Sequence, residues 1–103
     1  MAKSISDIRA ANDNEPRLAT VFLIMAQYHG KAIVSVDEIC RDYFPHLDAG
    51  KFVRKVAAGD ISIPLIRIEA SQKSAKGVHV NDLADYIDKQ ADLARKECRQ
   101  LAS

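Results

Sequence analysis

The chain has 103 residues, of which 48% are hydrophobic and 28% are charged, and its formal net charge is only +1. This composition is typical of one globular domain, and it excludes a collagen-like, disulfide-rich or wholly disordered chain. No apolar run approaches the roughly 20 residues that span a bilayer, and the N-terminus lacks the apolar core of a secretion signal, so we expect a cytoplasmic protein without a membrane partner.

Residues 1–16 predict a flexible tail. Their basic and acidic side chains nearly cancel, and no apolar period holds over this stretch. An alternative is a short arm that becomes ordered on a partner. The predicted folded domain covers residues 17–103.

The first predicted helix begins at Arg17, where apolar residues start to recur at steps of three and four. Gly30 is expected to end this helix, because glycine adopts a left-handed backbone without a Cβ clash. The short apolar run over residues 32–34 predicts a strand. The residues expected on the buried face of the helix are Leu18, Val21, Phe22, Met25 and Tyr28.

A second helix is predicted over residues 36–44. Ser35 and Glu38 have the spacing of a capping box, in which each residue satisfies a backbone amide of the other. Pro45 ends the helix, since the residue before proline avoids the helical region. The side chains expected to face inward are Ile39, Cys40 and Tyr43.

A third helix is predicted over residues 49–58, with Asp48 as its N-cap and Gly59 as its stop. Gly50 weakens the first turn, or permits a close approach to another group. The helix has two distinct faces. The apolar face comprises Phe52, Val53, Val56 and Ala57, and the basic face comprises Lys51, Arg54 and Lys55.

The next segment predicts a β-hairpin with a basic tip. Residues 61–68 are apolar and β-rich, residues 69–77 form a polar loop, and residues 78–80 resume a strand. Pro64 lacks an amide hydrogen, so the first of these strands is expected at an edge or with a bulge.

The last predicted helix covers residues 82–101, with Asn81 as its cap. It is too long for a core of this size to cover, so we predict a homodimer through its apolar stripe. The predicted contact residues are Tyr86, Ile87, Ala94, Cys98 and Leu101.

This order of elements predicts an α+β, mostly helical fold, a winged helix-turn-helix followed by a long C-terminal helix. Residues 48–77 hold six basic and three acidic side chains, whereas residues 82–97 hold three basic and five acidic ones. The near-neutral total therefore conceals a basic third helix and hairpin, as double-stranded DNA requires. The candidate DNA-binding residues are Lys51, Arg54, Lys55, Arg67, Gln72, Lys73, Ser74 and Lys76.

Nothing in the sequence indicates an enzyme. The chain contains no phosphate-binding G-x-x-x-x-G-K-S/T, no dinucleotide-binding G-x-G-x-x-G and no nucleophile motif G-x-S-x-G. Cys40 and Cys98 lie far apart and form no closely spaced ligand pair with the three histidines. We therefore predict no catalytic residue, no metal, no cofactor and no small-molecule ligand.

Six runs of residues between positions 19 and 101 are TVFLIMAQY (20–28), CRDYF (40–44), KFVRKV (51–56), SQKSAKGVHV (71–80), DLADYID (82–88) and KECRQL (96–101). In these runs the chain resembles the pyocin activator (PrtN-like) family of phage-type transcriptional activators. The resemblance implies promoter DNA as the partner, and activation of phage-tail-like bacteriocin or prophage genes as the function. It assigns no individual DNA contacts.

Two other functions stay open at this point. One is an excisionase-like architectural or recombination factor, which would bend DNA with a similar winged fold. The other is a protein-interaction adaptor, in which the last helix binds RNA polymerase or a repressor and the basic face is only solvated.

Overall fold

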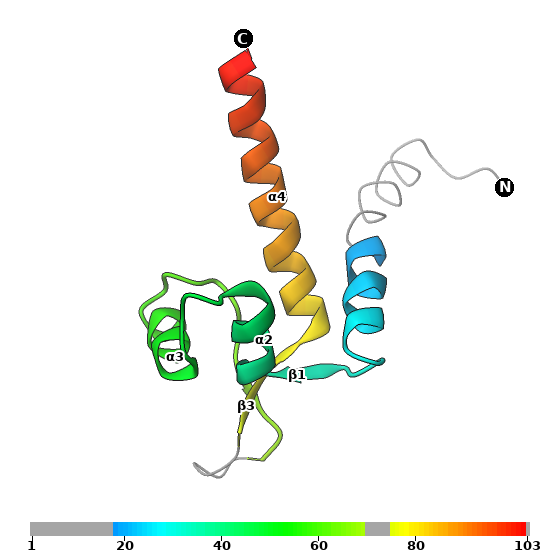
Figure 1. Cartoon of the computed structure of the whole chain (residues 1–103), viewed down its shortest axis with the longest axis vertical. Helices are drawn as coiled ribbons and strands as arrows, with labels where there is room; N and C mark the ends of the chain where they lie inside the picture. Colours follow the sequence, from blue (N-terminus) through cyan, green and yellow to red (C-terminus); the bar gives the residue numbers. More distant parts are fainter. Residues whose placement is uncertain (1–17, 70–74, 103) are drawn as a thin grey trace, which may run out of the picture.

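The computed structural model describes residues 18–69 and 75–102 of the chain (Figure 1). In this part the fold is α+β and mostly helical, with one small three-stranded antiparallel sheet. The predicted tail over residues 1–16 and the candidate residues Gln72, Lys73 and Ser74 lie outside the described residues.

The first helix includes residues 18–27 and ends as predicted at Gly30, whose φ of 78° is left-handed. The amide of Gly30 donates to the carbonyl of Met25 at 2.7 Å, which satisfies a carbonyl at the helix end. The residues that end this helix lie close together in the chain, so the sequence could predict where the helix ends.

The predicted buried face of this helix is partly wrong. Ile24 and Tyr28 are buried, whereas Leu18 and Phe22 are 55% and 67% exposed. The helix has apolar residues on more than one side, so its hydrophobic periodicity does not indicate which face is buried. The face is selected by packing against the core and by a hydrogen bond in which Thr20 Oγ1 donates to Asp88 Oδ1 at 2.7 Å.

Strand β1 (Ile33–Ser35) leads directly into helix α2 (Val36–Tyr43), and the predicted capping box is confirmed. The amide of Glu38 donates to Ser35 Oγ, and the amide of Ser35 donates to Glu38 Oε2, each at 3.2 Å. The helix ends at Phe44, directly before Pro45. Its buried side chains include Ile39 and Cys40.

Helix α3 (Ala49–Ala57) is also capped as predicted. The amide of Lys51 donates to Asp48 Oδ1 at 2.8 Å. The chain leaves the helix through Gly59, which has a φ of 83°. Phe52 is fully buried and fixes the direction in which the opposite face of α3 points.

The sheet has the strand order β1-β3-β2, with β3 (Lys76–His79) in the centre and β2 (Ile66–Arg67) at an edge. The predicted strand over residues 61–68 was too long. Ile61 and Ile63 are buried, but they enter the core from an irregular segment rather than from a ladder. Pro64, which has no amide hydrogen to donate, lies in this segment.

Helix α4 (Val80–Ala102) begins earlier than predicted, directly after β3. Asn81 lies inside the helix, so its assignment as the cap was wrong. The group that accepts from the Asn81 amide is Nδ1 of His79, at 3.0 Å.

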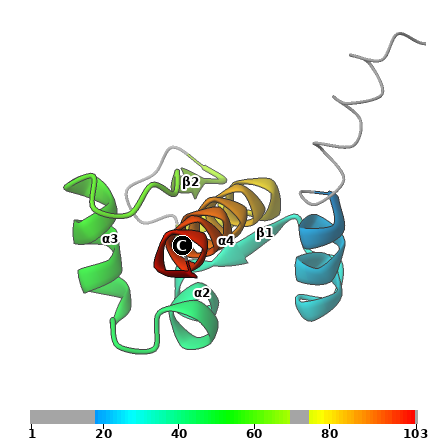
Figure 2. The ribbon, with the colours of Figure 1, turned by 90° about the horizontal axis from the view of Figure 1, so that it is seen from above.

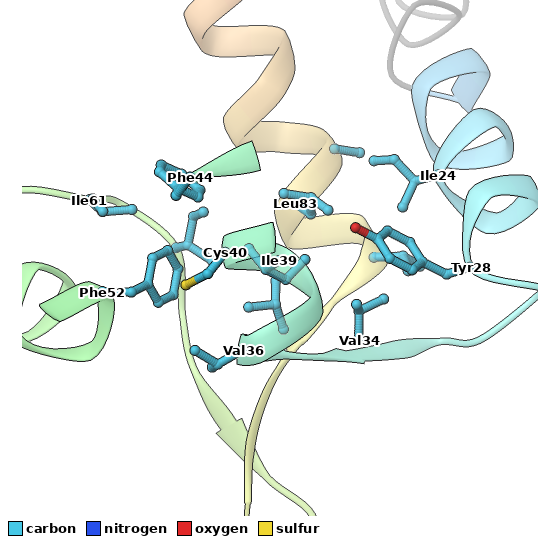
Figure 3. Packing of buried hydrophobic residues seen from close by; sticks show 14 residues of the cluster. Ile24, Tyr28, Val34, Val36, Ile39, Cys40, Phe44, Phe52, Ile61 and Leu83 are labelled. Atoms are coloured by element: carbon cyan, nitrogen blue, oxygen red, sulfur yellow. The ribbon is translucent and has the colours of Figure 1, made fainter. Parts of the chain in front are cut away.

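The core lies where α2, α3 and the base of α4 meet the sheet (Figure 3). In this core the ring of Phe44 lies 5.1 Å from the ring of Phe52 and 5.9 Å from that of Tyr86. The far half of α4 projects away from this core (Figure 1). Figure 2 shows α3 and the first helix on opposite sides of α4.

Candidate nucleic-acid interface

The outer face of α3 carries three exposed cations at helical spacing, Lys51, Arg54 and Lys55. They point outward because Phe52 occupies the opposite face and is fully buried in the core. The three cations line a shallow hollow of about 330 Å³, together with Ala58 and Asp60. The predicted separation of the basic and apolar faces holds here, although Ala57, expected on the apolar face, is exposed.

A second hollow, of about 500 Å³, joins α3 to the hairpin. Arg54 lines both hollows, and in the second it shares the wall with Lys76 of β3. Gly50 also lines this hollow, and a Cβ atom there would lie 3.7 Å from Arg54 Nη1. The guanidinium therefore lies over the first turn of α3, on the side that faces the hairpin.

Arg67 continues the same charged surface along the hairpin. It is the register partner of Lys76 in the β2–β3 pair, and its side chain is exposed. Five of the eight candidate DNA-binding residues thus lie in one continuous array, which we call the basic surface. Its members are Lys51, Arg54, Lys55, Arg67 and Lys76.

The cations of the basic surface have no ion-pair partner among the residues that the structure describes. Over residues 18–69 and 75–102, none of its five side chains forms an ion pair, whereas Lys31, Arg41 and Arg95 do so elsewhere. A cation without a carboxylate partner keeps its full attraction for an external phosphate.

A clamp between the first helix and α2 stabilises the frame on which α3 packs. The hydroxyl of Tyr28 donates to Asp42 Oδ2 at 2.6 Å. Hydrogen bonds from Arg41, and then from Tyr28, lower the pKa of Asp42 to about 2. Burial, and then the hydrogen bond to Asp42, raise the pKa of Tyr28 well above its usual value. Neither group changes charge near neutral pH, so the clamp stays closed there.

The sequence did not predict that the start of α2 would line the second hollow. Ser35, Val36 and Asp37 lie there beside Gly50. Hydrophobic periodicity indicates which face of a helix is buried, but not which other helix begins next to it. Asp37 also places one carboxylate in an otherwise basic hollow.

The predicted contact residues of α4 fall into two groups. Tyr86 and Ile87 are half-buried and pack against the core of their own chain. Ala94, Cys98 and Leu101 are exposed on the projecting half of the helix.

The described part of the chain has no three His, Cys, Asp or Glu side chains that gather closely enough to hold a metal ion. None of its helices combines the length and apolarity that crossing a bilayer requires.

The chain is similar to a known protein family. The family described as Pyocin activator protein PrtN matches residues 20–94, a range that contains the whole basic surface. No curated protein and no solved structure gives a significant match.

Proposed function

Because the chain belongs to the pyocin activator protein PrtN family, we propose that it is a sequence-specific transcriptional activator of phage-tail-like bacteriocin or prophage genes. It binds double-stranded DNA through a winged helix-turn-helix within residues 17–103. In this fold α2 and α3 form the helix-turn-helix, and the β2–β3 hairpin forms the wing. The observation that supports the proposal most is the basic surface, which runs from α3 to the hairpin and forms no ion pair within residues 18–69 and 75–102.

The proposal gives separate roles to α3 and to the wing. Helix α3 enters the major groove, where Arg54 donates two hydrogen bonds to a guanine and Lys51 and Lys55 meet phosphates. Arg67 and Lys76 contact the neighbouring phosphate backbone. The wing residues predicted to extend this contact are Gln72, Lys73 and Ser74.

We further propose that the protein acts as a homodimer joined through α4, by the exposed residues Ala94, Cys98 and Leu101. Two copies related by a two-fold axis read two inverted half-sites, which raises both affinity and selectivity. RNA polymerase is the partner that an activator bound upstream of a promoter would meet. The chain has no catalytic role in this account.

Fluorescence anisotropy tests the proposal with labelled DNA from upstream of the neighbouring genes and with a shuffled fragment of equal length. We expect the upstream fragment to bind at least about 10³-fold more tightly at physiological salt. Equal binding of the two fragments would contradict sequence-specific recognition and favour the adaptor function. A strong bend in the bound DNA would favour the excisionase-like function.

A pair of double variants tests the basic surface itself. Arg54→Ala/Lys55→Ala removes two cations from α3, and Lys89→Ala/Lys96→Ala removes two exposed cations from α4. We expect the first variant to lose at least about tenfold in affinity for the upstream fragment, and the second to bind like the wild type. Equal losses in both variants would mean that only total charge matters.

A further inference from the structure

The hollow between α3 and the hairpin holds a carboxylate as well as cations. Asp37, in the first turn of α2, is exposed and lines this hollow together with Arg54 of α3 and Lys76 of β3. A carboxylate at this place weakens the attraction of the basic surface for phosphate, because like charges repel. General affinity for DNA therefore does not account for Asp37.

The carboxylate of Asp37 forms no hydrogen bond and no ion pair with another residue that the structure describes. Neighbouring carboxylates are engaged, since Glu38 closes the capping box of α2 and Asp48 caps α3. Asp37 and Arg54 line the same hollow without pairing with each other. The acceptor oxygens of one and the donors of the other are thus both available to a single ligand.

We propose that Asp37 determines selectivity by accepting a hydrogen bond from the N4 amino group of a cytosine in the DNA site. This role rests on the DNA binding of the proposed function and names the base pair that the hollow recognises. In the major groove a G·C pair presents two acceptors, N7 and O6 of guanine, beside one donor, N4 of cytosine. Arg54 supplies donors for the guanine and Asp37 supplies an acceptor for the cytosine of the same pair.

The helices hold both side chains on well-defined supports. Ser35 Oγ accepts from the amide of Glu38 at 3.2 Å and fixes the first turn of α2, while Asp48 Oδ1 fixes that of α3 at 2.8 Å. A Cβ atom at Gly50 would lie 3.7 Å from Arg54 Nη1, so the guanidinium lies over the start of α3. Reading a base edge requires such supports, because the edge offers each group at one place only.

The same carboxylate disfavours incorrect sites. Where the hollow meets a phosphate, or a base pair with no amino group at this place, Asp37 loses its hydrogen bond and keeps its repulsion for the backbone. Lys76, in the same hollow, differs because a phosphate contact carries no sequence information. Asp37 therefore contributes to the choice of site rather than to affinity for DNA in general.

Two substitutions separate the hydrogen bond from the charge. Asp37→Ala removes both, whereas Asp37→Asn removes the charge and keeps an acceptor oxygen. Fluorescence anisotropy with the upstream and shuffled fragments gives a selectivity ratio for each protein. We expect Asp37→Ala to lower this ratio at least about fivefold, and Asp37→Asn to stay closer to the wild type than to Asp37→Ala. The control Glu97→Gln removes an exposed carboxylate of α4 and should leave the ratio unchanged.

Base-pair substitution identifies the contact itself. Each G·C pair that the wild type protects in the upstream fragment is replaced in turn by A·T. At one of these pairs we expect the wild type and Lys76→Gln to lose affinity by the same factor, and Asp37→Ala to lose at least about fivefold less. Circular dichroism checks that each variant is folded, which the exposure of Asp37 favours.

Three outcomes would overturn the role of Asp37 alone. Tighter binding of both fragments by one common factor in Asp37→Ala and Asp37→Asn would mean that only charge matters. An unchanged ratio in Asp37→Ala would leave Asp37 a purely structural role in α2. Equal losses for all proteins at every G·C pair would exclude the cytosine contact. Failure of the proposed function is recognised separately, because the wild type would then bind the two fragments equally.

Discussion

Gly77, on the central strand β3, has no room for a side chain. A Cβ atom there would lie 2.7 Å from Ile33 Cγ2 and 3.0 Å from the carbonyl oxygen of Val34. Because β1 would have to move, we expect Gly77→Ala to lower the free energy of unfolding by about 1–3 kcal/mol in a urea titration.

Gly50 is the matched control for this substitution. The nearest atom to a Cβ there is Asp48 Oδ1, at 3.4 Å, and the residue lies inside α3. Alanine is a better helix former than glycine by up to about 1 kcal/mol, so Gly50→Ala should keep or raise stability. A Gly77→Ala protein as stable as Gly50→Ala would contradict the packing of β3 against β1.

The lowered pKa of Asp42 predicts how the stability of the protein depends on pH. Its pKa of about 2 lies below its ordinary value of 3.8, so its ionised form favours the folded state. This contribution is complete above the ordinary pKa and is lost as the pH falls from about 4 to about 2. Asp42→Asn should therefore have a lower Tm at pH 7 and a smaller further loss over the acid interval, measured by circular dichroism. Parallel Tm curves for the two proteins would rule out this role.

Single residues were predictable where their partners are local. Ser35 and Asp48 bond amides three residues ahead, so the sequence alone indicates both caps. The orientation of the first helix was not predictable, because it depends on a bond from Thr20 to Asp88, which lies 68 residues away in the chain. Leu18 and Phe22 were assigned to the core for this reason.

At the level of elements, the start of α4 depends on a histidine. Nδ1 of His79 accepts from the amide of Asn81 and so satisfies one of the free donors of the first turn. We expect His79→Ala to lower the free energy of unfolding by about 1 kcal/mol, and His79→Asn, which keeps a side-chain acceptor, to restore most of it. Urea titration at neutral pH measures both. An asparagine variant no more stable than the alanine variant would contradict the capping role.

The helices were predicted more accurately than the strands because helices have local signals. The bounds of α2 and α3 follow from caps and stops within a few residues of each end. The segment over residues 61–68 is β-rich, but Ile61 and Ile63 are used to fill the core, and only Ile66 and Arg67 pair with β3. Tertiary packing overrides the β propensity of the segment.

At the level of the whole molecule, charge is separated although its total is near zero. The sequence shows how many cations the third helix and hairpin carry, but not that they form one surface. Arg54 and Lys76 are brought to the same hollow only by folding. The structure was therefore needed to show that these cations lie next to one another, whereas the sequence alone showed which residues they are.

The salt dependence of DNA binding should report how many phosphates the basic surface contacts. Each phosphate contact contributes about 0.9 to the slope of log affinity against log salt concentration. We expect Arg54→Ala/Lys55→Ala to reduce the magnitude of the slope by about 1, because Lys55 is the phosphate contact that it removes, whereas Arg54 contacts a guanine. An unchanged slope together with weaker binding would mean that neither side chain meets a phosphate.

The central claim, that α3 lies in the groove of a specific DNA site, is tested most directly by tethered cleavage. An iron–EDTA reagent is attached at residue 58 in Ala58→Cys/Cys98→Ser, beside the cations of α3, or at the native Cys98 on the projecting half of α4. The account predicts strand cleavage at the bound site from residue 58 and little from Cys98. Cleavage from Cys98 without cleavage from residue 58 would contradict it and place the DNA against α4.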